Sequence, residues 1–168
     1  TDGYAEAMEE KKKAKQEKER KATARVERAK TRQRLQDMQT IPQLIKLAQK
    51  EFNAYIRARD KRAGHPCISS GRPLDWSGNG VDAGHYRSVG AAGHLRFDER
   101  NVHAQSKHDN QYRAGNVVEY RINLIKRIGL EAVEALEADN HVHQWTREEL
   151  RQIAATYRSK KKELEKQR

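Results

Sequence analysis

Hydrophobic positions are sparse in the first quarter of the chain. Residues 9–38 contain no glycine or proline and are mostly Glu, Lys, Arg, Gln and Ala, which favour the helix. Glu/Lys and Glu/Arg pairs at helical spacing add support, and Val26, Leu35 and Met38 are the clearest apolar residues of this stretch. The pattern predicts a basic helical arm over residues 1–40, which either forms one long solvated helix or frays in solution.

Apolar residues become periodic after residue 40. Leu44, Ala48, Phe52 and Ile56 recur at every fourth position, and Pro42 suits the first turn of a helix. This spacing predicts an amphipathic helix that packs on a core. Next come glycine-rich and polar residues, among which "VDAGHYRS" and "LRFDERNVHAQ" predict two short strands of a hairpin with a broad loop.

Helical periodicity returns near Asn110, and the predicted helix ends at Gly129. A short helix over "LEAVEALEA" follows, and a capping box of Thr146 and Glu149 begins the last helix. The predicted apolar faces of the first and last of these helices consist of Val117, Tyr120, Leu124 and Ile128, and of Leu150, Ile153 and Tyr157. Residues 41–168 are therefore expected to form one α+β domain.

Charge adds a class of partner to this picture. The 168 residues carry a net charge of +11, and residues 41–130 hold 15 Lys and Arg against 8 Asp and Glu. A protein this basic usually binds a polyanion, most often nucleic acid. The chain has no apolar run long enough to span a membrane, no visible signal peptide and a single cysteine, so we expect a cytoplasmic location and no internal disulfide.

The order of the central elements resembles the layout of ββα-metal nucleases of the HNH type. A four-residue window from Cys67 to Ser70, with the spacing of a zinc knuckle, precedes the first strand. A second window of this spacing, from Ser106 to Asp109, leads into a helix. Hydrolysis of a phosphodiester needs a base that activates water and a divalent cation that holds the phosphate. The predicted fold class is α+β, with a small HNH-like ββα-metal core, flanking helices and a long N-terminal helix; the predicted cofactor is Mg²⁺ or Mn²⁺.

Three residues are the main candidates for this chemistry. His85, on the first strand, is the candidate general base, with a structural histidine as the alternative. Asn110 is a candidate metal ligand, with a helix cap as the alternative. Asp82 points to the opposite face of the strand from His85, on the side of Gly84, where HNH nucleases usually carry a metal-binding aspartate. Asp82 is therefore a second candidate metal ligand, with turn or hairpin packing as the alternative.

Further candidates surround these three. On the second strand, Asn101 is expected to orient His85, and His103 is expected to face the same cleft. Arginines near the proposed site are the first candidates for DNA contacts; they are Arg72, Arg87, Arg96, Arg100 and Arg113.

From about Ile41 to the C-terminus, the sequence closely resembles the NinG, or Rap, recombination endonuclease family of lambdoid phages. The resemblance rests on "PCISSGRPLDWSGNGVDAGHYRS", on "LRFDERNVHAQSKHDNQYRAGNVVEYRINLIKRIGLEAVEALE" and on "WTREEL". It implies a metal-dependent endonuclease, made in the bacterial host, that cuts branched DNA such as Holliday junctions and D-loops. It also implies that Asn110 takes the place of an asparagine metal ligand that follows a C-x-x-C window.

The chain departs from that family at the two zinc-knuckle windows, Cys67–Ser70 and Ser106–Asp109. Cys67 is retained, but Ser70, Ser106 and Asp109 stand where family members carry cysteines. Hydroxyls are poor zinc ligands, so we expect degenerate knuckles without structural zinc. The alternative is a substitute site formed by His65, Cys67, His108 and Asp109.

Two functions remain open from the sequence. The first is a DNA junction endonuclease, and the alternative is a non-catalytic protein with a degenerate nuclease fold that binds branched double-stranded DNA. Because resolving a four-strand junction takes two cuts, a homodimer is expected, with the N-terminal helix as the candidate contact.

Overall fold

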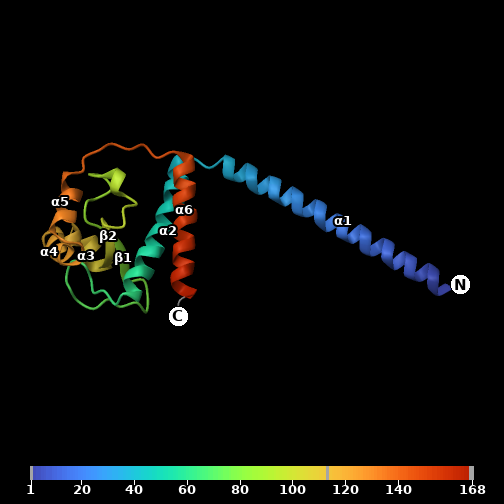
Figure 1. Ribbon diagram of the computed structural model, residues 1–168, viewed down its shortest axis with the longest axis horizontal. Helices are drawn as coiled ribbons and strands as arrows, with labels where there is room; N and C mark the ends of the chain where they lie inside the picture. The colour runs from blue at the N-terminus through green and yellow to red at the C-terminus, as the bar shows by residue number, and fades with distance from the viewer. Residues whose placement is uncertain (1, 113, 167–168) are drawn as a thin grey trace. The chain divides into compact units, whose positions relative to one another are not determined.

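The computed structural model describes residues 2–112 and 114–166, and the chain divides into two compact units, Thr1–Thr40 and Ile41–Arg168. The first unit is the helix α1 (Asp2–Asp37), drawn in blue in Figure 1. Val26 and Leu35 of this helix are solvent-exposed, and so is Met38 directly after it. The long solvated helix predicted from the sequence is thus present.

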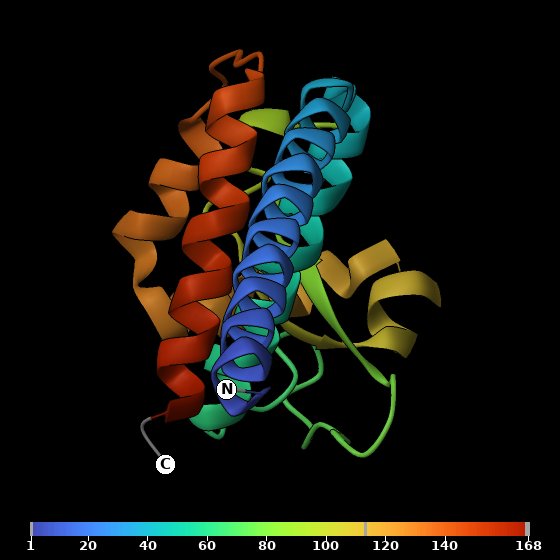
Figure 2. The same cartoon turned by 90° about the vertical axis from the view of Figure 1, so that its right-hand side faces the viewer.

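The second unit is built on two helices that lie side by side and run in the same direction, α2 (Ile41–Arg62) and α6 (Arg147–Lys166) (Figures 1 and 2). The predicted stripe of α2 is fully buried at Leu44, Ala48, Phe52 and Ile56. The Phe52 ring meets the Tyr157 ring edge-on, at 4.7 Å between centroids. Burying these side chains is the main stabilising contribution to this half of the unit.

A two-stranded antiparallel sheet lies next to this helix pair. Strand β1 (Val81–His85) pairs with β2 (Val102–Ser106), so that Val81 lies opposite Ser106 and His85 opposite Val102. Ala83 and Val102 join the apolar cluster of α2 and α6. The fold is therefore helix-rich α+β with a small sheet, as predicted.

The helices α4 (Val117–Ile128) and α5 (Leu130–Ala138) contain a second apolar cluster. Tyr120 and Leu124 pack there with Ile68, and the Tyr120 hydroxyl donates a 2.9 Å hydrogen bond to the Gly84 carbonyl of β1. Gly129 separates the two helices at φ 89°, a conformation that favours glycine, and this confirms the predicted helix end. Val117, predicted on the buried face of α4, is instead half-exposed.

Two predicted boundaries are wrong. The second strand begins only at Val102, because η1 (Gly93–Leu95) and turns occupy the residues before it. The helix predicted from Asn110 starts earlier, as α3 (Lys107–Tyr112), and Ser106 caps it by accepting the Asp109 N–H at 3.1 Å. The backbone then breaks at η2 (Ala114–Asn116), where Gly115 has φ 78°.

Within the described ranges, no helix is both long and apolar enough to cross a membrane.

Candidate functional site

The start of β1 and the helix α3 bring Asp82 and Asn110 together. The Asp82 carboxylate accepts hydrogen bonds from the side-chain amides of Asn110, at 3.0 Å, and Gln111, at 3.2 Å. The elements meet here because α3 directly follows β2 and its first N–H, that of Lys107, donates to the Gly80 carbonyl at 2.8 Å. Asn110 is not a helix cap, because Ser106 fills that position.

The donor set at this cluster suits a hard divalent cation. Asp82 supplies a carboxylate, and the amides of Asn110 and Gln111 can present their oxygens if they rotate. Mg²⁺ commonly keeps several water ligands and needs only one or two carboxylates from the protein. The residues present therefore fit a cation such as Mg²⁺ or Mn²⁺.

A hollow of about 470 Å³ adjoins Asp82. Arg57 and Lys61 on α2, Lys107 on α3 and Lys161 on α6 bring four positive charges to its lining, against the one carboxylate of Asp82. Trp76 and Asn79, from the loop before β1, also line it. The excess of positive charge makes this hollow a candidate site for phosphate groups.

Sequence reasoning missed the cations of this hollow. They come from three helices that lie far apart along the chain, so no local motif joins them. The one available signal was the spacing of Arg57 and Lys61, because residues four apart lie on the same face of a helix.

His85 is held by the loop between the strands. Its Nε2 lies 3.0 Å from the Arg96 carbonyl, which can only accept a hydrogen bond, so we assign the proton to Nε2. That tautomer leaves the lone pair of Nδ1 for a proton. Burial lowers the pKa of His85 below its usual range despite this hydrogen bond, so the ring is neutral at pH 7. A neutral imidazole is the form that a general base requires.

The structure does not place His85 beside the Asp82 cluster. The two residues lie on opposite faces of β1, three steps apart along the strand, a rise of roughly 10 Å. The predicted base, His85, is thus separate from the predicted metal ligands, Asp82 and Asn110.

Asn101 and His103 make contacts other than those expected of them. The buried Asn101 amide donates to the carbonyls of Arg87 and Leu95 and accepts the Arg87 N–H, so it secures the loop after β1 rather than His85. His103 is 3% exposed, with Nδ1 3.4 Å from the Tyr120 hydroxyl. Burial, and then the nearby Arg59 guanidinium, lowers the pKa of His103 to about 3. It is a neutral interior residue and does not face a cleft.

Three of the predicted DNA-binding arginines make contacts within the protein. Arg87 donates to the carbonyls of Leu136 and Asp139 at the end of α5. Arg96 donates to Gln49 at 3.2 Å, and Arg100 forms a two-fold contact with Asp98. Arg72 is exposed, and Arg113 lies outside the described residues.

The two knuckle windows meet through hydrogen bonds. The Cys67 thiol donates to the Asp109 carboxylate at 3.4 Å, and the Ser106 hydroxyl donates to the same oxygen at 2.7 Å. The Ser106 N–H donates to the Cys67 sulfur at 3.3 Å. Over the described ranges the structure shows no side-chain hydrogen bond for Ser70, which lies in the turn that the Gly71 N–H closes onto the Cys67 carbonyl.

The substitute metal site is not assembled. In the part of the chain that the structure describes, no three His, Cys, Asp or Glu side chains are grouped so that they could hold a metal ion. This finding argues against joint coordination by His65, Cys67, His108 and Asp109. It does not bear on the Asp82 cluster, whose other members are amides.

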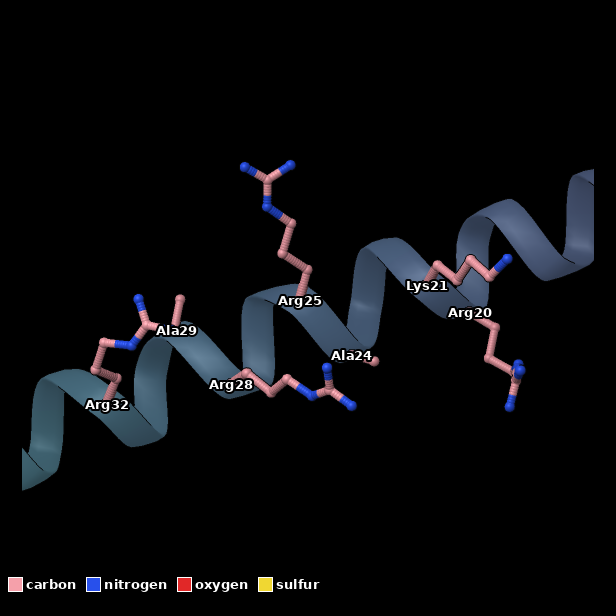
Figure 3. A pocket seen from close by; sticks show the side chains of 7 residues that line it. All are labelled: Arg20, Lys21, Ala24, Arg25, Arg28, Ala29 and Arg32. Carbon is pink, nitrogen blue, oxygen red and sulfur yellow. The ribbon is translucent and has the colours of Figure 1, made fainter.

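The middle of α1 carries a dense set of cations. Figure 3 shows Arg25 projecting to one side of the helix and Arg20 and Arg28 to the other. Only residues of α1 line the surface drawn there, so it is an open helix surface rather than an enclosed site. Arg20 also contacts Glu17 on the preceding turn at 2.9 Å.

The family model and the similar proteins found by comparison all have the same name. Residues 2–167 match the family model described as "Bacteriophage Lambda NinG protein". Proteins named ninG from Escherichia phage 933W, Salmonella phage P22 and Escherichia phage lambda are 50%, 49% and 48% identical to this chain over 122 residues. These alignments cover 71% of the chain and 57%, 57% and 56% of the relatives, so it spans little more than half the length of the curated relatives it matches. No solved structure matches the chain.

Proposed function

This chain belongs to the NinG family of lambdoid phage proteins, and on that premise we propose that it is a metal-dependent DNA endonuclease of the HNH type. The proposed substrates are branched recombination intermediates such as Holliday junctions and D-loops. One observation carries the proposal: the Asp82–Asn110 cluster lies at the edge of a hollow lined by four cations. This arrangement puts hard oxygen ligands beside a surface that attracts phosphates.

In this proposal Asp82 and Asn110 are the residues that would hold Mg²⁺ or Mn²⁺. When bound, the ion would neutralise charge on the phosphodiester and on the departing oxygen. Arg57, Lys61 and Lys107 bind the phosphates on either side of the bond to be cut. They fix the DNA backbone and carry no sequence information.

His85 is the proposed proton acceptor. Its Nδ1 takes a proton from the attacking water, whose oxygen bonds to phosphorus while a phosphorus–oxygen bond of the DNA backbone breaks. The departing oxygen keeps the bonding electrons and takes up a proton from solvent water. The lowered pKa keeps the imidazole neutral, and the hydrogen bond to the Arg96 carbonyl fixes which nitrogen is available.

A second function has an observation in its favour. The separation of His85 from the Asp82 cluster is the arrangement expected of a protein that has kept the fold and the basic surface without the cutting chemistry. Such a protein would bind branched DNA and leave it intact.

Cutting of a four-way junction decides between the two functions. Wild-type protein is incubated with a labelled junction and a linear duplex of the same length, with Mg²⁺, Mn²⁺ or a chelator. We expect junction cutting that needs the metal and is abolished by Asp82→Asn, whereas Glu119→Gln, an exposed change on α4, leaves it intact. Junction binding without cutting under every metal condition would establish the second function.

A further inference from the structure

The hollow beside Asp82 contains an aromatic side chain that the core does not use. The chain has two tryptophans. Trp145 packs against the cluster of α2 and α6, whereas Trp76 belongs to neither apolar cluster of the unit. Trp76 is half-buried and lines the hollow. Because this large aromatic ring lies outside the core and next to a candidate reaction site, Trp76 is a candidate ligand-binding residue.

The loop presents this ring in a fixed turn. The Asp75 carboxylate accepts the Ser77 N–H at 2.9 Å and the Ser77 hydroxyl at 2.6 Å, which closes the backbone around Trp76. The Lys61 ammonium lies 5.9 Å from the centre of the indole ring. The ring and the cation therefore form one surface.

The cations of the hollow remain available to a ligand. Across the described ranges, Arg57, Lys61 and Lys107 form no ion pair with a carboxylate. Lys161 contacts Glu165 at 3.4 Å one turn along α6, but the two side chains are 38% and 57% exposed, so water screens the attraction. Ala54 and Ala58 also line the hollow, and their short side chains leave room between the cations.

The combination of ring, cations and size indicates one chemical class of ligand. Single-stranded nucleic acid is bound by cationic grooves that follow its backbone and by aromatic rings on which its bases stack. In a duplex, each base already stacks on its neighbours and cannot offer a face to the indole. The hollow, of about 470 Å³, is within the usual size of small-ligand sites, so it has room for a single nucleotide.

We propose that the Trp76 indole stacks on an unpaired base of the DNA, while Arg57, Lys61 and Lys107 bind the adjoining phosphates. This inference deepens the proposed function and rests on it, because it names the feature of branched DNA that the site recognises. The recognised feature is an unstacked nucleotide at the point where strands part.

Binding measured without metal tests the stacking apart from any cutting. The probes are a short labelled oligothymidylate and a duplex of equal phosphate number, with a chelator present. Trp76→Ala should weaken oligothymidylate binding by roughly 5- to 150-fold, the range expected for loss of one stacked base, and should change duplex affinity less than two-fold. Trp76→Phe should keep most of the affinity, and Tyr4→Ala, which removes an exposed aromatic of α1, should have no effect.

Two further measurements keep the test decisive. Oligothymidylate should quench the tryptophan fluorescence of the wild type but not of Trp76→Phe, which retains only Trp145. The double variant Arg57→Gln, Lys61→Gln should weaken binding of both probes and flatten its salt dependence. An unchanged oligothymidylate affinity in Trp76→Ala, or equal losses for both probes, would overturn the stacking proposal.

The outcomes also separate this inference from the proposed function. If Trp76 proves to bind single strands while no metal supports cutting, the endonuclease proposal fails and the stacking proposal stands. If the wild type cuts junctions and Trp76→Ala cuts them with unchanged rate and affinity, the stacking proposal alone fails.

Discussion

The Cys67 thiol and the Asp109 carboxylate, 42 residues apart in the chain, lie 3.4 Å apart and are both buried. Together with Ser106 they link the turn before β1 to the start of α3. If cysteines stood at all four knuckle positions, a zinc ion would join these two segments; here hydrogen bonds connect them.

Asp109→Ala should therefore destabilise the protein. The change removes the acceptor of two hydrogen bonds and leaves the Cys67 thiol and the Ser106 hydroxyl without it, at a cost of about 1–3 kcal/mol in the free energy of unfolding. Urea denaturation of the variant measures this loss, with Glu134→Ala, which removes an exposed carboxylate of α5, as the control. An unchanged urea midpoint for Asp109→Ala would show that the link contributes nothing.

Removing metal should leave the stability of the fold nearly unchanged. Structural zinc can supply much of the folding energy of a small domain, but here apolar burial between α2 and α6 and around Tyr120 stabilises the unit. We expect less than one zinc per chain by elemental analysis and a melting temperature that barely responds to a chelator. One tightly bound zinc whose removal sharply lowers the melting temperature would contradict this prediction.

His85→Ala should remove cutting and spare binding. General-base catalysis contributes about 10²–10⁴-fold to a rate, whereas affinity for DNA depends on many phosphate contacts. Because burial lowers the pKa of His85, the ring is neutral at pH 7, and the cutting rate should decline with acid at a lower pH than for an ordinary histidine base. Single-turnover rates measured against pH test both statements, and a wild-type rate in His85→Ala would exclude His85 as the base.

Asn110→Ala should raise the concentration of Mg²⁺ or Mn²⁺ that gives half of the maximal cutting rate. Loss even of an outer partner of a metal ligand commonly costs about 10–100-fold in metal affinity, so a direct ligand should cost at least about 10-fold. Metal titrations of Asn110→Ala are compared with those of Gln152→Ala, an exposed change on α6. Identical titration curves would limit Asn110 to its hydrogen bond with Asp82.

The free energy of unfolding should fall with acid because His103 is buried in its neutral form. Its pKa is about 3 in the folded protein and near 6.5 when unfolded, so between these values the unfolded chain binds a proton that the folded protein does not. The stabilisation is complete above about pH 6.5 and is lost progressively toward pH 3. Urea denaturation between pH 7 and pH 4 should show a shallower pH dependence for His103→Gln than for wild type. Gln152→Ala, an exposed change on α6 that removes no titratable group, should keep the wild-type slope.

Local patterns predicted much of the fold. The four-residue spacing from Leu44 to Ile56 predicted α2 and its buried face, because apolar periodicity determines which side of a helix leaves water. Asp82 and Asn110 were predicted as metal ligands from the resemblance to HNH nucleases, and the structure brings the two side chains together where β1 begins and α3 follows β2. These relationships depend on elements that are adjacent along the chain or paired as strands.

The remaining features depend on contacts that no local pattern encodes. Asn101 was expected to support a catalytic histidine, but its amide satisfies backbone groups of a loop whose path is set by tertiary packing. The hollow takes its cations from α2, α3 and α6, and only the side-by-side packing of α2 and α6 brings Lys161 near Lys61. Such sites become visible only when the elements are placed in space.

The parallel packing of α2 and α6 has a consequence for synthesis of the protein. The ribosome makes α2 before any other element of this unit and α6 after all the others, with residues 63–146 between them. Until residues 147–166 have been made, the face of α2 that carries Phe52 and Ile56 lacks the helix that covers it. At roughly 5–20 residues per second, this apolar face waits several seconds for its partner. The first helix of the unit is thus the segment with the greatest need of protection while the chain is growing.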